Sequence, residues 1–133
     1  PTELALTWDY STQGFSPREH PLARHRPWLQ ERGISPIAAL HSAEDKARIT
    51  LAGLVVLRQR PPTAKGVMFL LLEDETERVQ CVLPPPVYDR FKTIVGREGA
   101  VIVTGLVERA GRYHRCLLLQ DARPLGREVF ALV

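Results

Sequence analysis

The stretch RQRPPTAKGVMFLLLED, residues 58–74, decides how the rest of this chain is organised. An arginine-rich strand end leads into a Pro-Pro turn, a loop that contains Lys65, and an apolar strand that holds Phe69 and ends in two acidic residues. Cations can bind phosphates and a flat aromatic ring can stack on a base, and these are the two contacts that single-stranded nucleic acid needs. The stretch therefore predicts a nucleic-acid-binding surface, and it has no features of a catalytic centre.

Apolar and β-branched runs on both sides of this stretch predict five β-strands. The strands cover residues 48–60, 67–73, 78–83, 99–109 and 112–120. Apolar residues at helical spacing predict one amphipathic helix over 87–95, between the third and fourth strands. Gly53 in the first run indicates a bulge or a sharp bend. The order β-β-β-α-β-β is that of the OB-fold, a five-stranded Greek-key barrel, so the predicted fold class is all-β with minor α.

Residues 1–46 are expected to form a helical arm in front of the barrel, which covers residues 47–123 and is followed by a tail over 124–133. The pattern of residues predicts a helix over 21–32 that ends at Gly33 in the C′ position. Ser35 and Pro36 predict the N-cap and first residue of a second short helix through Leu40.

Composition narrows the possible functions. The 133 residues suffice for one domain with a core, and 44% of them are hydrophobic. The formal net charge is +3, and residues 47–123 hold twelve basic against eight acidic side chains, which favours a polyanionic partner. Cys81 and Cys116 lack CxxC spacing, which indicates small buried side chains in a reducing compartment. The four histidines lack ligand spacing, so neither a metal nor a cofactor is expected.

A location in the cytoplasm is expected from two further features of the sequence. No apolar run approaches the roughly 18 residues of a membrane span, so no contact with a membrane is expected. No charged, apolar and small-residue leader opens the chain.

The expected binding face consists of the second and third strands together with the loops over 60–66 and 109–112, which are both basic. Its candidate nucleic-acid-binding residues are Arg58, Arg60, Lys65, Phe69, Gln80, Arg109, Arg112, Tyr113 and Arg115. The cations would contact phosphates independently of sequence, and the aromatic rings would stack on bases. Strand alternation puts Phe69 on one face of its strand and Met68 and Leu70 on the other. Either face could fill a barrel, so Phe69 is a core residue or a stacking platform.

Two motifs resemble the bacterial DNA polymerase III alpha family. Residues 49–121 resemble the OB domain near the C-terminus of these polymerases, and more closely that of error-prone translesion polymerases of the ImuC type. Residues 9–34, with Gly14-Phe15-Ser16 and His20-Pro21-Leu22, are similar to the linker that precedes this domain. The chain departs from the family pattern at 76–78, where relatives often have a glycine, and at the triple proline 84–86.

The polymerase resemblance implies a non-catalytic accessory domain of a bacterial protein that works at the nucleoid. The palm aspartates and the acidic and histidine cluster that such polymerases use have no counterpart in this sequence. The acidic residues of 73–77 have no histidine or cysteine nearby, and we expect them to form a charged hairpin turn and not a catalytic pair.

A more distant likeness supports the same face. Phe69, Leu72 and Asp74 resemble a pattern in the OB-fold anticodon-binding domains of class II aminoacyl-tRNA synthetases. The resemblance implies that Phe69 stacks on a base and that Gln80 stands at the position of a polar reader.

Two functions remain open from the sequence. The first is a module that binds single-stranded DNA beside a polymerase or repair complex. The second is a protein-interaction module that docks a polymerase accessory factor or a second copy of the chain, without binding nucleic acid. Its anchors would be Trp8, Tyr10, Phe15 and Trp28, because aromatic residues are frequent at interfaces.

Overall fold

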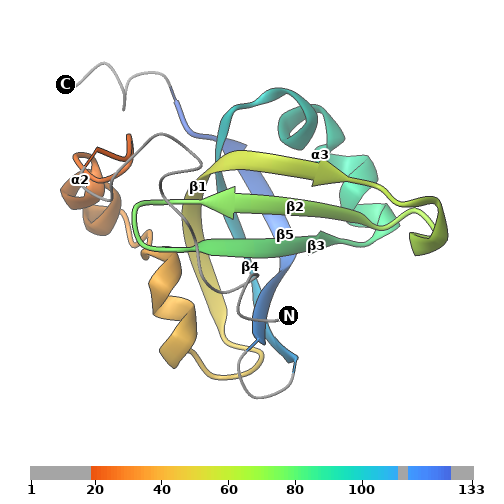
Figure 1. Ribbon diagram of the computed structural model, residues 1–133, viewed down its shortest axis with the longest axis horizontal. Helices are drawn as coiled ribbons and strands as arrows, with labels where there is room; N and C mark the ends of the chain where they lie inside the picture. Colours follow the sequence, from red (N-terminus) through yellow and green to blue (C-terminus); the bar gives the residue numbers. More distant parts are fainter. Residues whose placement is uncertain (1–18, 111–113, 127–133) are drawn as a thin grey trace.

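The computed structural model describes residues 19–110 and 114–126, and its main feature is a closed β-barrel (Figure 1). The strands are β1 (Arg48–Gln59), β2 (Met68–Glu73), β3 (Arg78–Leu83), β4 (Ala100–Ala110) and β5 (His114–Pro124). They are hydrogen-bonded in the order β1-β2-β3-β5-β4, and β1 also pairs with β4. Only the β3–β5 pairing is parallel. This is the OB-fold arrangement, and the predicted fold class is confirmed.

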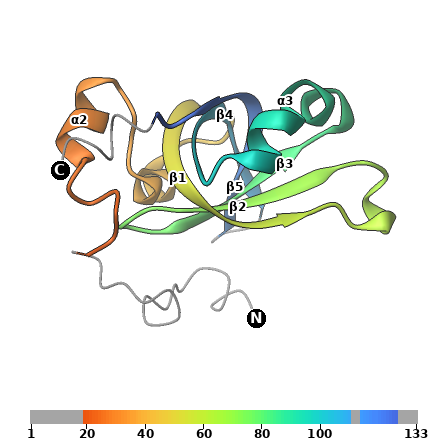
Figure 2. The ribbon, with the colours of Figure 1, turned by 90° about the horizontal axis from the view of Figure 1, so that it is seen from above.

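Alternate residues of the strands fill the barrel. Met68, Leu70 and Leu72 of β2 are buried in the main core, and so are Val79, Cys81 and Leu83 of β3. The helix between the third and fourth strands, α3 (Pro85–Arg97), packs against β2, β3 and β5 and buries Phe91 and Val95 in the same core (Figure 2).

Helix α3 begins two residues before the predicted start. Pro84 is its N-cap, and Pro85 and Pro86 occupy its first turn. Proline is well tolerated there because the first amide groups of a helix have no partner within the helix, and the φ angle of proline is already helical. The triple proline thus starts this helix immediately after β3.

Strand β1 contains one extra residue, Val56. Val55 is paired with Leu72 and Leu57 with Leu71, so two steps along β1 match one step along β2. The bulge expected at Gly53 therefore lies at Val56. Gly53 instead lets β1 and β2 approach each other closely, because a Cβ atom added there would lie 2.9 Å from the Cβ atom of Leu72.

The arm consists of α2 (Arg26–Glu31) and the 3-10 helix η2 (Ile37–Ser42), and a second 3-10 helix, η3 (Pro62–Ala64), lies in the loop between β1 and β2. Helix α2 is shorter than the predicted 21–32, because proline at the second helical position fixes its start. Gly33 follows its C-cap with φ of +73°, as predicted. Ser35 is not an N-cap, because it forms an isolated bridge with Leu51 of β1.

A second, smaller core joins the arm to the barrel. Leu22, Leu29 and Ile34 pack there against Ala52 of β1 and Ile102 of β4. Leu125 also belongs to this core, so burial continues beyond the end of β5. The arm therefore covers one side of the barrel, and the loop between β1 and β2 projects at the opposite end (Figure 1).

Candidate nucleic-acid interface

The outer face of β1, β2 and β3 carries two rows of largely apolar side chains. Directly paired residues of antiparallel strands point to the same side of a sheet. The first row is Gln59, Phe69 and Val82, and the second is Leu57, Leu71 and Gln80. We call these six residues the outer face. Both glutamines are exposed, the Leu57 side chain is 46% exposed, and the other three residues are half-buried.

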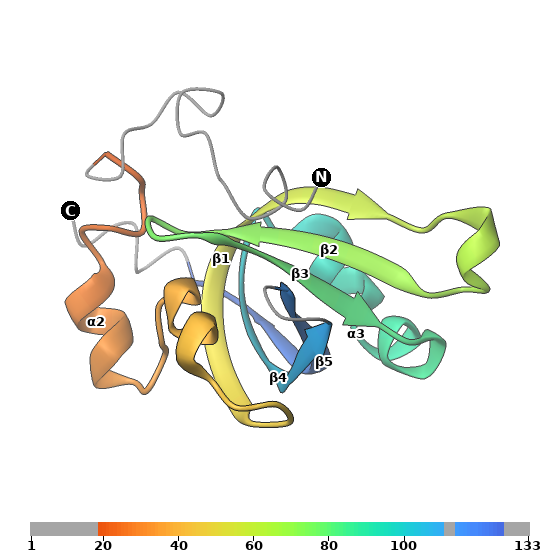
Figure 3. The ribbon, with the colours of Figure 1, turned by 60° about the horizontal axis from the view of Figure 1, so that its bottom comes forward.

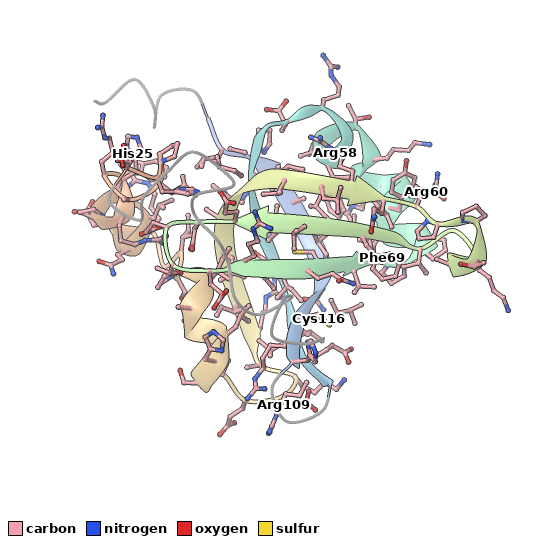
Figure 4. All side chains as sticks on the ribbon, in the orientation of Figure 1. His25, Arg58, Arg60, Phe69, Arg109 and Cys116 are labelled. Carbon is pink, nitrogen blue, oxygen red and sulfur yellow. The ribbon has the colours of Figure 1, made fainter. Side chains whose placement is uncertain are left out.

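Phe69 lies on this outer face and not in the core. The core residues of β2 are its neighbours Met68, Leu70 and Leu72, whereas Phe69 is half-buried outside the barrel. Of the two roles that the sequence left open for Phe69, this position excludes the core residue, and the stacking platform stays a prediction. In the view of Figure 4, Phe69 lies between Arg60 and Arg109, which come from the two ends of the expected face.

The bulge at Val56 turns Arg58 of β1, and Arg60 directly after the strand, away from the outer face. Arg58 is paired with Leu70, which points into the barrel. The Arg58 side chain donates hydrogen bonds from Nε to the Val95 carbonyl oxygen (2.6 Å) and from Nη2 to the Glu98 carbonyl oxygen (2.8 Å). These carbonyls belong to the C-terminal end of α3, where a cation also interacts favourably with the helix dipole. Arg58 thus has a structural role at α3.

Arg60 also points to α3. Its guanidinium lies 4.0 Å from the ring centroid of Tyr88, in the first turns of that helix (Figure 4). Gly66, at the other end of this loop, lies close to Pro85 of α3. A Cβ atom added to Gly66 would lie 3.3 Å from Cγ of Pro85. Both ends of the loop over 60–66 are therefore close to the first turns of α3, and the loop itself projects beyond the barrel (Figure 3).

Lys65 is the second exposed cation of this loop, after Arg60. It follows η3 in the left-handed conformation, with φ of 54°, and glycine follows it. No ion pair or side-chain hydrogen bond of Lys65 is found within 19–110 and 114–126. The Lys65 ammonium group is thus available to a phosphate at the end of the outer face nearest Phe69.

The second basic loop brings two arginines together. Arg109 of β4 and Arg115 of β5 are directly paired across the hairpin. Like charges in directly opposite positions repel one another, and an anion between them would relieve the repulsion. Arg112 and Tyr113, the other two predicted site residues of this loop, lie outside the described residues.

The acidic turn between β2 and β3 has a role that the sequence did not reveal. The buried Asp74 carboxylate accepts hydrogen bonds from the Ile37 amide (2.7 Å) and from Nη2 of Arg26 (3.1 Å). Buried Glu73 lies 2.9 Å from Nε2 of His20. These contacts attach the arm to the barrel. Because the partners are 37 or more residues apart in the sequence, local patterns could not have found them.

Arg26 and Glu75 form the half-buried part of this attachment. Two hydrogen bonds of 2.7 Å join the Arg26 guanidinium to the two carboxylate oxygens of Glu75. Burial alone would raise the pKa of Glu75, but the hydrogen bond and charge of Arg26 outweigh it, and the pKa lies below its ordinary value. The pKa of Arg26 is raised in turn, because Glu75 and Asp74 outweigh the opposite effect of burial.

The two cysteines are free thiols. Cys81 is buried in the barrel and Cys116 is half-buried on β5, and burial raises the pKa of both thiols. Among the helices of residues 19–110 and 114–126, none combines the length and the apolar character that crossing a membrane requires.

Comparison with known proteins gives relatives by sequence and solved structures of similar fold. The error-prone DNA polymerases of Anaeromyxobacter dehalogenans and Caulobacter vibrioides are 42% and 43% identical over 104 and 102 residues. These alignments cover 78% and 77% of this chain but only 9% of each polymerase. They are longer than the barrel, so the similarity extends into the sequence that flanks it. The resemblance to error-prone polymerases is thus confirmed for a segment of about a tenth of their length.

The solved structures and family models agree on the barrel. The asparaginyl-tRNA synthetase from Pyrococcus horikoshii, complexed with asparaginyl-adenylate, superposes with a TM-score of 0.58 at 22% identity, over 69% of this chain and 22% of the synthetase chain. That likeness establishes the fold. The tRNA anti-codon family model, described as an OB-fold nucleic acid binding domain, matches residues 49–119, more than half of the chain. The chain therefore belongs to the family of OB-fold nucleic acid binding domains.

Proposed function

We propose that this chain is a non-catalytic module that binds single-stranded DNA for an error-prone DNA polymerase in replication or translesion repair. Its place of action would be the nucleoid, in the bacterial cytoplasm. The observation that carries the proposal is the position of Phe69, a half-exposed ring on the outer face of a barrel of the nucleic-acid-binding OB family. Stacking on such a ring contributes about 1–3 kcal/mol per base and suits any base.

The proposed path of the strand follows the cations. It runs from Lys65 past Phe69 and Leu71 to the arginine pair Arg109 and Arg115, which lies beside the start of β3 because β3 and β5 are parallel. Arg112 and Tyr113 remain proposed members of this second loop. Arg58 and Arg60 are assigned to α3 instead, since both side chains contact that helix.

The lack of catalysis is part of the proposal, and the acidic turn supports it. Of its carboxylates, Asp74 and Glu75 are bound to Arg26, and Glu73 to His20 and Arg78. A general acid or base would need a carboxyl group that can reach a substrate in a pocket. Carboxylates that hold the arm in place do not meet this requirement.

Fluorescence anisotropy of a labelled 20-nucleotide oligothymidine, titrated at several salt concentrations, tests this function. Phe69→Ala should weaken binding by about 5- to 150-fold, the equivalent of one stacked base. Phe69→Leu keeps an apolar side chain on the sheet but removes the flat ring, so it should weaken binding as well. Three phosphate contacts, by Lys65 and the arginine pair, predict a log-log salt slope of about −2.

The outcomes of this titration separate the two functions considered above. Saturable binding that both Phe69 variants weaken supports the single-strand module. No binding of wild-type protein near 50 mM salt would refute it and would leave the protein-interaction module. Of the proposed anchors of that module, Trp28 packs on the second core and is stacked by Arg32 at 3.8 Å. Trp8, Tyr10 and Phe15 lie outside the described residues.

A further inference from the structure

We infer that Gln59 reads bases together with Gln80, and that the ligand of the outer face is any nucleic-acid strand whose bases have free Watson–Crick edges. This inference rests on the proposed single-strand binding and adds to it a residue and a class of ligand.

The strand register places Gln59 next to the stacking ring. Gln59 is the direct partner of Phe69 on β1, and Gln80 is the direct partner of Leu71 on β3. Direct partners have Cβ atoms about 5 Å apart. The two amides therefore stand on opposite sides of β2, diagonally across the Phe69–Leu71 pair, and both are exposed. Gln59 points outward only because the bulge at Val56 precedes it.

The six residues of the outer face are uncharged, and the next row on the same side of the sheet, Leu54, Glu73 and Arg78, has its two charges paired with one another. The two rows of the outer face consist of a phenylalanine, two leucines, a valine and the two glutamines. The arginines that neighbour Gln59 in sequence, Arg58 and Arg60, point to α3. A neutral, apolar surface favours bases over phosphates, so a bound strand should turn its bases toward the sheet and its phosphates toward the flanking cations.

The chemistry of the amide then defines the ligand. A glutamine side chain has both a hydrogen-bond donor and an acceptor. The Watson–Crick edge of every base offers an adjacent donor and acceptor as well, so one amide can make two hydrogen bonds with any unpaired base. In a duplex these groups are already bonded to the opposite strand. The outer face should therefore select single strands and should tolerate any base.

The experiment pairs a change in the protein with a change in the base. Gln59→Leu replaces the amide with an apolar side chain of similar size, and the matched control is Gln30→Leu, at an exposed glutamine of α2. Each variant is titrated with labelled 20-nucleotide oligothymidine and with the same oligonucleotide made of N3-methylthymidine. The methyl group removes the N3 donor from the Watson–Crick edge and leaves the ring able to stack.

Gln59→Leu should bind oligothymidine at least about fivefold more weakly than wild type, the lower end of what a two-hydrogen-bond contact contributes, and Gln30→Leu should bind as wild type does. Methylation of the bases should weaken the binding of wild-type protein about fivefold more than it weakens the binding of Gln59→Leu. A Gln59→Leu/Gln80→Leu double variant should be insensitive to methylation.

Two results would overturn the inference while the single-strand function stands. One is unchanged affinity of Gln59→Leu, and the other is an equal loss on methylation in wild type and Gln59→Leu. Wild-type protein that binds no oligothymidine would refute the proposed function itself, and the inference with it. Duplex DNA that competes as well as the single strand would refute the assignment of the ligand class.

Discussion

Replacement of Asp74 should loosen the arm and destabilise the whole domain. The Asp74 side chain is fully buried and accepts five hydrogen bonds. Oδ2 receives those of the Ile37 amide and the Arg26 guanidinium, and Oδ1 receives those of the Thr76 amide, the Thr76 hydroxyl and the Glu77 amide. One carboxylate therefore fixes the start of η2, the docking of α2 and the shape of the β2–β3 turn.

The magnitude follows from the partners that Asp74→Ala would leave behind. Removal of one member of a buried charge pair costs about 3–5 kcal/mol. Arg26 would keep its two hydrogen bonds to Glu75, so the lower end of this range, about 3 kcal/mol, is expected. That is a large part of the 5–15 kcal/mol that stabilises a typical domain. At about 3–5 °C per kcal/mol for a chain of this size, Tm should fall by roughly 9–15 °C.

Urea unfolding followed by circular dichroism measures the free energy of unfolding, and hydrogen exchange at the Ile37 amide reports on the arm. Asp89→Asn, at an exposed residue of α3, is the control and should change the free energy of unfolding by no more than about 0.5 kcal/mol. A loss below about 1 kcal/mol for Asp74→Ala, with unchanged protection of Ile37, would refute the role of this carboxylate in holding the arm.

Three further predictions concern other parts of the molecule. Because the folded-state pKa of Glu75 lies below its ordinary 4.5, its contribution to stability is present above that pH and is lost as the pH falls through the folded-state pKa. Urea midpoints from pH 2 to 6 should therefore fall less steeply for Glu75→Gln than for wild type. Gly105→Ala should cost about 3 kcal/mol in urea unfolding, because the added Cβ atom would meet the Leu118 carbonyl oxygen, and a loss below 1 kcal/mol would contradict this close approach. Arg58→Met should cost about 1–2 kcal/mol of stability by removing two hydrogen bonds to α3 and should leave oligothymidine affinity unchanged, whereas a shallower salt slope would show that Arg58 contacts phosphate.

The fold could be predicted from the sequence because its signals are local. Runs of apolar and β-branched residues mark each strand, and one helical pattern between the third and fourth strands selects the OB order. Strand alternation already predicted that Phe69 and its neighbour Leu70 lie on opposite faces of the strand, but it did not say which face is the core. The alternation within β2 and the closed barrel then decide the face, since Met68, Leu70 and Leu72 fill the core.

Features that depend on distant partners could not be predicted. The acidic turn has the composition of any solvated hairpin, and only the folded chain brings Arg26 and His20 to it. The bulge at Val56 has no local signal either, because it lies in an unbroken run of β-branched and apolar residues. Its position decided the orientation of Arg58, Arg60 and Gln59, so these three orientations could not be predicted from sequence patterns.

The extra residue in β1 makes the chemistry of the binding surface depend on chain length. A shift by one residue moves every following side chain of a strand to the other face. Insertion of one residue after Leu57, with the bulge at Val56 kept, would put Arg58 opposite Phe69 on the outer face and would turn Gln59 to the opposite side of the sheet. The surface would become cationic without any substitution. A single inserted residue in the first strand is thus enough to exchange a neutral side chain for a cationic one beside Phe69.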